Sequence, residues 1–135
     1  MNKTVVLAYS GGARSSAAVS WLNDRHDAHV VTVTLDLGQS ADLAEIRARA
    51  MSDGAVRAHV LDKREAFAGD IVLPSLKAGA LSDARYPMAT ALSRPPIAKS
   101  LVEIAAIEKT AFVSQAPPAA TAAASRSRLP RSIPR

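Results

Sequence analysis

A short apolar run near the start of the chain ends abruptly in hydroxyl side chains and two adjacent glycines. Residues 5–16 read VVLAYSGGARSS. The valines, the leucine and the tyrosine favour an extended, buried strand, whereas Gly11 and Gly12 allow backbone angles and close approaches that a side chain would block. Ser15 or Ser16 can then cap a following helix. This stretch therefore predicts a strand, a tight loop and the start of a helix.

Such a corner brings several unpaired backbone N–H groups and the positive end of a helix dipole to one place. Both attract anions, so the corner suits a phosphate or pyrophosphate group, and a nucleotide is the first functional hypothesis. The sequence is neither Gly-x-Gly-x-x-Gly nor a Walker loop that ends in Gly-Lys-Ser or Gly-Lys-Thr. An ordinary strand-to-helix turn is the alternative that the loop alone leaves open.

Apolar, β-branched runs alternate with segments of helical periodicity along the rest of the body. We expect further strands over 30–35, 58–62 and 111–114, and helices over 16–22, 42–51, 65–80 (disturbed or divided at Pro74) and 97–108. This alternation predicts βαβ crossovers, and therefore an α/β fold with a doubly wound parallel sheet. Ligands of such sheets bind at the carboxyl ends of the strands, where the glycine corner, Asp36 and Asp62 fall. Asp36 either contacts a ribose or a metal there or simply ends its strand.

Composition limits the class of protein. With 135 residues and 48% apolar content, the chain has room for one domain with a real core. It has no cysteine for disulfide or thiolate chemistry, and its three histidines lack metal-ligand spacing. No run approaches the roughly 18 apolar residues of a membrane span, and no signal peptide is evident. We therefore expect a cytoplasmic protein without a metal site built from its own side chains and without a membrane partner.

The formal charge of +5 lies mostly in the last residues of the chain. Residues 115–135 hold four arginines and no acid, whereas the remainder holds 13 basic and 12 acidic side chains. The body therefore has no basic field, and the tail arginines lack the interleaved aromatic residues that stack on bases, so nucleic acid is not the expected partner. The tail is rich in Ala, Pro and Ser without periodicity, which is typical of a disordered segment and also of an out-of-frame reading of GC-rich coding sequence. We expect an α/β domain over 1–114 and a disordered tail over 115–135.

Four blocks of sequence, in this order and spacing, resemble the N-terminal part of argininosuccinate synthase. They are VVLAYSGG at 5–12, DLGQ at 36–39, RYPMATALSRP at 85–95 and VEIA at 102–105. The resemblance runs from about residue 3 to 114 and implies a Rossmann-like fold of the N-type ATP pyrophosphatase (PP-loop) kind. It also implies a two-step ligation in arginine biosynthesis. Citrulline is first adenylated by ATP with release of pyrophosphate, and aspartate then displaces AMP.

The resemblance also implies roles for individual residues. Citrulline would contact Tyr86 and Thr90, while the adenine would lie against Leu35, where the family usually has alanine. The residues that would line the ATP phosphates are Ala8, Tyr9, Ser10, Gly11, Gly12, Ala13, Arg14, Ser15 and Ser16.

Several departures from the family pattern bear on activity. The family loop reads Ser-Gly-Gly-Leu-Asp-Thr-Ser, so Arg14 stands where the family has an acid that can cap the helix or help to hold Mg²⁺. Arginine can do neither, although it can bind phosphate as a cation. Ala91 replaces a frequent serine near citrulline. After residues 112–114 the family continues with a second glycine-rich loop that serves ATP and aspartate, and then with an oligomerisation region, neither of which is recognisable here.

We therefore expect a ligase of this family reduced to its ATP-binding part, inactive alone and without the family's oligomer contacts. The alternatives are a stand-alone nucleotide-binding module and a weak nucleic-acid-binding protein that acts through its tail.

Overall fold

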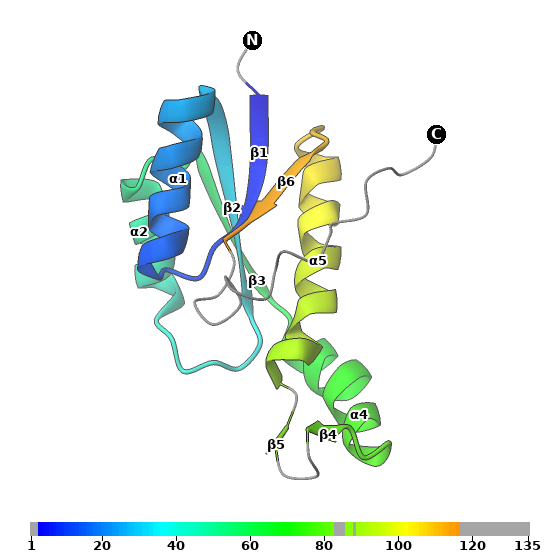
Figure 1. Ribbon diagram of the computed structural model, residues 1–135. Helices are drawn as coiled ribbons and strands as arrows, with labels where there is room; N and C mark the ends of the chain where they lie inside the picture. Colours follow the sequence, from blue (N-terminus) through cyan, green and yellow to red (C-terminus); the bar gives the residue numbers. More distant parts are fainter. Residues whose placement is uncertain (1–2, 83–85, 88, 117–135) are drawn as a thin grey trace.

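The computed structural model describes residues 3–82, 86–87 and 89–116, and four parallel strands in this part form one sheet (Figure 1). The strands are β1 (Lys3–Ala8), β2 (Ala28–Asp36), β3 (Arg57–Asp62) and β6 (Phe112–Gln115), in the order β3-β2-β1-β6. The register pairs Val5 with Val30 across β1 and β2, and Val6 with Val113 across β1 and β6. The predicted parallel sheet is confirmed.

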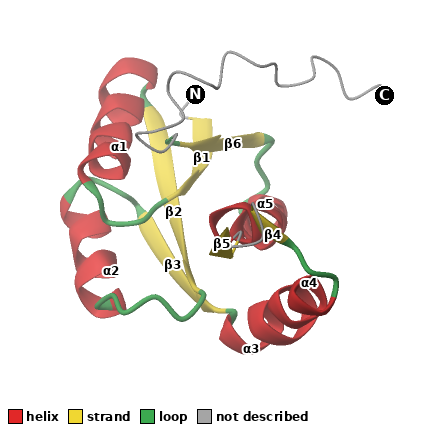
Figure 2. Ribbon diagram, turned by 60° about the horizontal axis from the view of Figure 1, so that its bottom comes forward, coloured by secondary structure: helices red, strands yellow, loops and turns green. Residues whose placement is uncertain are grey.

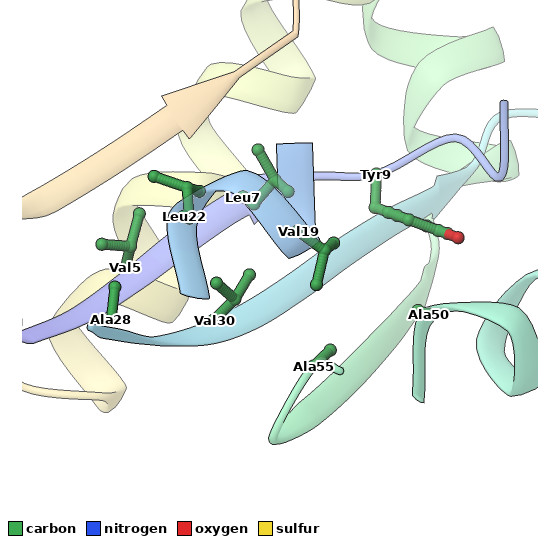
Figure 3. Packing of buried hydrophobic residues seen from close by; sticks show 9 residues of the cluster. All are labelled: Val5, Leu7, Tyr9, Val19, Leu22, Ala28, Val30, Ala50 and Ala55. Carbon is green, nitrogen blue, oxygen red and sulfur yellow. The ribbon is translucent and has the colours of Figure 1, made fainter. Parts of the chain in front are cut away.

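Helices cover both faces of the sheet, so the central strand β2 is buried almost throughout (Figure 2). The helices α1 (Ala13–His26) and α2 (Leu43–Ser52) lie on one face and α5 (Ala89–Ile107) lies on the other. On the first face, Val19 and Leu22 of α1 pack against Val5 and Val30 (Figure 3). On the second face, Leu101, Ile104 and Ala105 of α5 pack against other side chains of β1 and β2. Burial on both faces explains why residues 30–34 of β2 are all β-branched.

The order of the strands reverses direction at β1, which creates a topological switch point at the carboxyl end of this strand. Strands β1, β2 and β3 follow one another outward, after which the chain crosses back to place β6 on the other side of β1. The return path contains α3 (Arg64–Ala66), the π-helical turn η1 (Phe67–Val72), α4 (Leu73–Lys77) and a short antiparallel pair, β4 (Leu81–Ser82) with β5 (Tyr86–Pro87). The connection that leaves β1 runs through α1 on one face of the sheet, whereas the connection that enters β6 runs through α5 on the other face. Sheets of this kind hold their ligands at such a point.

Helix α1 begins earlier than the sequence predicts, and this changes the expected cap. Gly12, in extended conformation, precedes the first helical residue Ala13, and no side chain caps the helix. The prediction that Ser15 or Ser16 caps it is wrong, because both lie inside the first turns. The Ser15 hydroxyl instead donates to the Gly12 carbonyl at 2.9 Å.

Two other boundaries also differ. Helix α5, expected over 97–108, begins at Ala89 and includes Pro95 and Pro96. Proline disfavours helical geometry in the preceding residue and removes a backbone N–H donor, so the sequence alone predicts a helix boundary at these prolines. In the structure, the apolar contacts of the following turns with the sheet outweigh this local free-energy cost. Strand β6 extends to Gln115, one residue into the segment expected to be tail. The remaining tail, residues 117–135, lies outside the described residues.

Candidate functional site

A cleft of about 840 Å³ opens at the carboxyl ends of β1 and β2, beside the start of α1. The first half of α5 and the end of β6 close its other side. Eight of the ten residues predicted to bind ATP line it, namely Ala8, Tyr9, Ser10, Gly12, Ala13, Arg14, Ser15 and Leu35. Gly11 and Ser16 are not among the lining residues. The glycine corner thus lies at the switch point of the sheet.

The residues that begin α1 line this cleft. The first N–H groups of an α-helix have no acceptor within the helix, and in α1 they belong to Ala13, Arg14 and Ser15, which all line the cleft. The helix dipole adds partial positive charge at the same place. Gly11 has φ +78°, a conformation that favours glycine, and this turn carries the chain from β1 into the helix. The corner can therefore hold an anionic group.

The side chain of Tyr9 connects the corner to α2 through its hydroxyl. The residue is 3% exposed, and its hydroxyl donates to Asp53 Oδ2 at 2.6 Å and lies 3.1 Å from the Ser16 hydroxyl. Burial raises the pKa of the Tyr9 phenol above its ordinary value, and the hydrogen bond to Asp53 raises it further. The hydroxyls of Tyr9 and Ser16 thus serve the packing of the corner, which explains why Ser16 does not line the cleft.

The charge of the cleft wall is positive within the described part of the chain. Arg14 and Arg94 are among its lining residues, whereas no Asp or Glu is. Mg²⁺ in proteins is usually bound by one or two carboxylates together with substrate phosphates. The described residues contain no group of three or more metal-ligating side chains, and they offer no carboxylate in the cleft. The side chains described here therefore do not fit a protein-held Mg²⁺ at this site.

Asp36 ends its strand and is held by local contacts. Its Oδ1 accepts from the Gly38 N–H at 3.0 Å, and its Oδ2 lies 3.4 Å from Arg64 Nε. Arg64 also donates two side-chain hydrogen bonds to Asp62, which lowers the pKa of the Asp62 carboxyl to about 2. Neither aspartate lines the cleft. Of the two interpretations of Asp36, the geometry favours the strand-ending one.

Several lining residues were not singled out from the sequence. The apolar part of the wall includes Ile46 of α2 and Ile97 of α5, and its second cation is Arg94. Gln39 also lines the cleft, and its side chain braces the loop after β2 by donating to the Leu35 carbonyl at 2.7 Å and accepting from the Leu37 N–H at 2.8 Å. Gln39 and Arg94 fall inside the blocks that carry the family resemblance, which is the signal that could have found them.

The predicted citrulline residues belong to the stretch that leads into α5. Tyr86 is in β5 and Thr90 is in the first turn of α5, but their side chains lie outside the described part of the structure. Ser93 and Arg94, about one turn further along the same helix, line the cleft. Separately, no helix among the described residues has the length and apolar character needed to cross a membrane.

A parallel sheet covered on both faces, with an anion-attracting corner at its switch point, defines a doubly wound α/β domain of the nucleotide-binding class. Residues 4–119 match the family model described as the arginosuccinate synthase N-terminal HUP domain. The chain belongs to the argininosuccinate synthase family.

Two curated sequence relatives support the same assignment. The chain is 50% identical over 101 residues to argininosuccinate synthase of Dictyoglomus turgidum, covering 75% of this chain and 25% of that protein. It is 47% identical over 113 residues to the synthase of Symbiobacterium thermophilum, covering 83% and 28%. The chain thus spans about a quarter of the length of the curated relatives it matches.

Among solved structures it is similar to NAD+ synthetase from Burkholderia pseudomallei, with 24% identity, a TM-score of 0.46 and coverage of 77% of this chain and 46% of that one.

Proposed function

We propose that this chain binds ATP in the cleft at the carboxyl ends of β1 and β2, as the nucleotide-binding part of an argininosuccinate-forming ligase. The observation that carries the proposal is the corner itself. The N-terminal turn of α1 and two arginines line the cleft, and no carboxylate does so among the described residues. That arrangement suits a polyphosphate, while Leu35 and its apolar neighbours in the wall suit the adenine ring.

The reaction that the family resemblance implies is compatible with such a corner. The ureido oxygen of citrulline attacks the α-phosphate of ATP, the bond to the bridging oxygen breaks, and pyrophosphate leaves with the charge that develops. Preorganised N–H donors and a helix terminus stabilise that charge without covalent help from the protein. The amino group of aspartate then displaces AMP from the citrullyl adenylate. By resemblance, Tyr86 and Thr90 would contact citrulline in the first step.

Among the residues that the structure describes, only part of this machinery has a candidate location. No side chain in the described part of the chain has a candidate role toward aspartate, and the chain matches about a quarter of the length of its relatives. We propose that this polypeptide, assayed alone, binds nucleotide but does not complete the ligation. Any Mg²⁺ would arrive on the nucleotide phosphates, held by them and by water rather than by a carboxylate of the described cleft wall.

Calorimetric titration of the 135-residue protein with ATP and with pyrophosphate tests the proposal. Both should bind saturably, with ATP the tighter ligand because the adenine adds apolar contacts. Arg14→Met should weaken both, whereas Arg47→Met, which removes an exposed cation of α2 that does not line the cleft, should not. Absence of binding to either ligand would contradict the proposal. Binding of citrulline to the ATP complex would separate a ligase part from a stand-alone nucleotide-binding module, which has no use for it.

A further inference from the structure

The peptide between Gly11 and Gly12 is held by a side chain that comes from α2. Arg49 Nη1 donates to the Gly11 carbonyl oxygen at 2.9 Å, and Arg49 Nη2 donates to Glu45 at 2.6 Å. Arg49 follows Gly11 by 38 positions, so this contact depends entirely on the packing of α2 beside the corner. The Gly11 carbonyl is therefore turned toward α2.

The direction of this carbonyl determines the direction of the next N–H. The described chain contains no cis peptide bond, and in a trans peptide the C=O and the following N–H point to opposite sides. With the Gly11 carbonyl on α2, the Gly12 N–H points away from α2. The lining of the cleft agrees with this direction, because Gly12 belongs to it and Gly11 does not.

The two glycines also make the opposite orientation accessible. A peptide plane rotates through ψ of its first residue and φ of its second, and both residues here are glycines, which tolerate either sign of φ. In the rotated state a carbonyl oxygen instead of an N–H would face the cleft, and it would repel a phosphate. A contact that selects one orientation therefore matters more at this peptide than at one flanked by larger residues.

We propose that Arg49 is a positioning residue for anion binding, which holds the Gly11–Gly12 peptide so that the Gly12 N–H faces the phosphates of the bound nucleotide. This inference rests on the proposed ATP site and adds a role for α2, which contributes no cation to the cleft wall itself. The hydrogen bond from Tyr9 to Asp53 attaches the other side of the turn to the end of the same helix. Ser10 thus lies between two attachments to α2.

The test uses pyrophosphate as the probe and the full 135-residue protein. Arg49→Met should weaken pyrophosphate binding about tenfold, the effect expected when one charge-assisted hydrogen bond no longer supports the binding geometry. Arg49→Lys, which keeps a donor, should recover part of the loss. Arg47→Met removes an equal charge from the same helix without touching the corner, so it should change the affinity by less than about twofold. Thermal unfolding of each variant separates these effects from loss of the fold.

A second measurement needs no variant. Pyrophosphate added to the unaltered protein should shift the backbone amide resonance of Gly12 more strongly than that of Gly11. An unshifted Gly12 amide, or equal losses of affinity in Arg49→Met and Arg47→Met, would overturn the role of Arg49 while the nucleotide site stands. Failure of the unaltered chain to bind pyrophosphate at all would overturn the proposed function and this inference together.

Discussion

At the scale of single residues, Gly11 combines a left-handed backbone with a close neighbour. Its φ is +78°, and a Cβ added there would lie 3.0 Å from Ile46 Cγ1. Gly38 has φ +94°, but nothing lies within 4 Å of an added Cβ, so only its backbone conformation favours glycine. We expect Gly38→Ala to lower the free energy of unfolding by about 1–2 kcal/mol and Gly11→Ala to lower it further. Urea unfolding measures both, and an equal or smaller effect at Gly11 would contradict the contact with Ile46.

Arg14 gives the cleft wall a cation where the family has an acid. Arg14→Asp should weaken the binding of metal-free ATP, because it replaces a cation with an anion beside the phosphates. Mg²⁺ should then strengthen the binding of ATP to this variant relative to its binding of metal-free ATP, because the new carboxylate supplies a metal ligand that the described wall lacks. Titrations of both proteins with and without Mg²⁺ decide this. If the substitution leaves the Mg²⁺ dependence unchanged, Arg14 does not occupy the place of the family's acid.

Tyr9 links the corner to the pH dependence of stability. Burial, and then the hydrogen bond to Asp53, raise the pKa of its phenol above 10.0. The folded protein holds this proton more tightly than the unfolded chain, so the stabilisation is complete below pH 10 and is lost as the pH rises through the folded pKa. Of the two tyrosines in the sequence, Tyr86→Phe leaves only Tyr9. Its ultraviolet titration should have a midpoint above 10, and a midpoint at 10 or lower would contradict the buried geometry.

At the scale of elements, α5 is fastened to the sheet at its end as well as along its apolar face. The side chain of Glu108, directly after the helix, is 7% exposed and accepts two hydrogen bonds from Arg57 Nη1, at 2.9 and 3.0 Å. Glu108→Gln should lower the free energy of unfolding by about 1–3 kcal/mol, since it removes the charge of a largely buried partner. Glu103→Gln, whose ion pair with Lys99 on the exposed side of α5 spans 4.0 Å, should change it by no more than about 0.5 kcal/mol. Chemical unfolding compares the two, and equal effects would exclude Glu108 as an anchor.

At the scale of the whole molecule, a ligation requires that ATP, citrulline and aspartate be held together. Such positioning is worth roughly 7–11 kcal/mol in favourable systems. The alignment to the Dictyoglomus turgidum synthase covers about a quarter of that protein. The described residues include a candidate site for ATP, and none of them has been given a role toward aspartate. We expect no citrulline-dependent release of pyrophosphate above background from the purified chain. The synthase of Dictyoglomus turgidum serves as the positive control, and turnover near about 1 s⁻¹ by this chain would contradict the expectation.

The sequence by itself determined the kind of sheet and the place of the corner. The β-branched run over residues 30–35 indicates a strand covered on both faces, and the alternation of strands with helices indicates parallel pairing. The pair Gly11 and Gly12 marks the turn, because its backbone conformation is a local property. The wrong helix boundary at Pro95 and Pro96 has the same origin. Sequence propensities reflect the local conformational cost of proline and do not include the tertiary packing that outweighs it.

Only the tertiary structure decided which elements are neighbours. The position of β6 beside β1, the approach of Ile97 and Arg94 to the cleft, and the contact of Arg49 with Gly11 all join segments far apart in the chain. Periodicity in the sequence indicates that one face of an element is buried, but it does not indicate which element covers that face. The hydrophobic effect is non-directional, so many partners would bury the same apolar area equally well. The geometry of the corner depends on such contacts, whereas its chemical character follows from its own residue types.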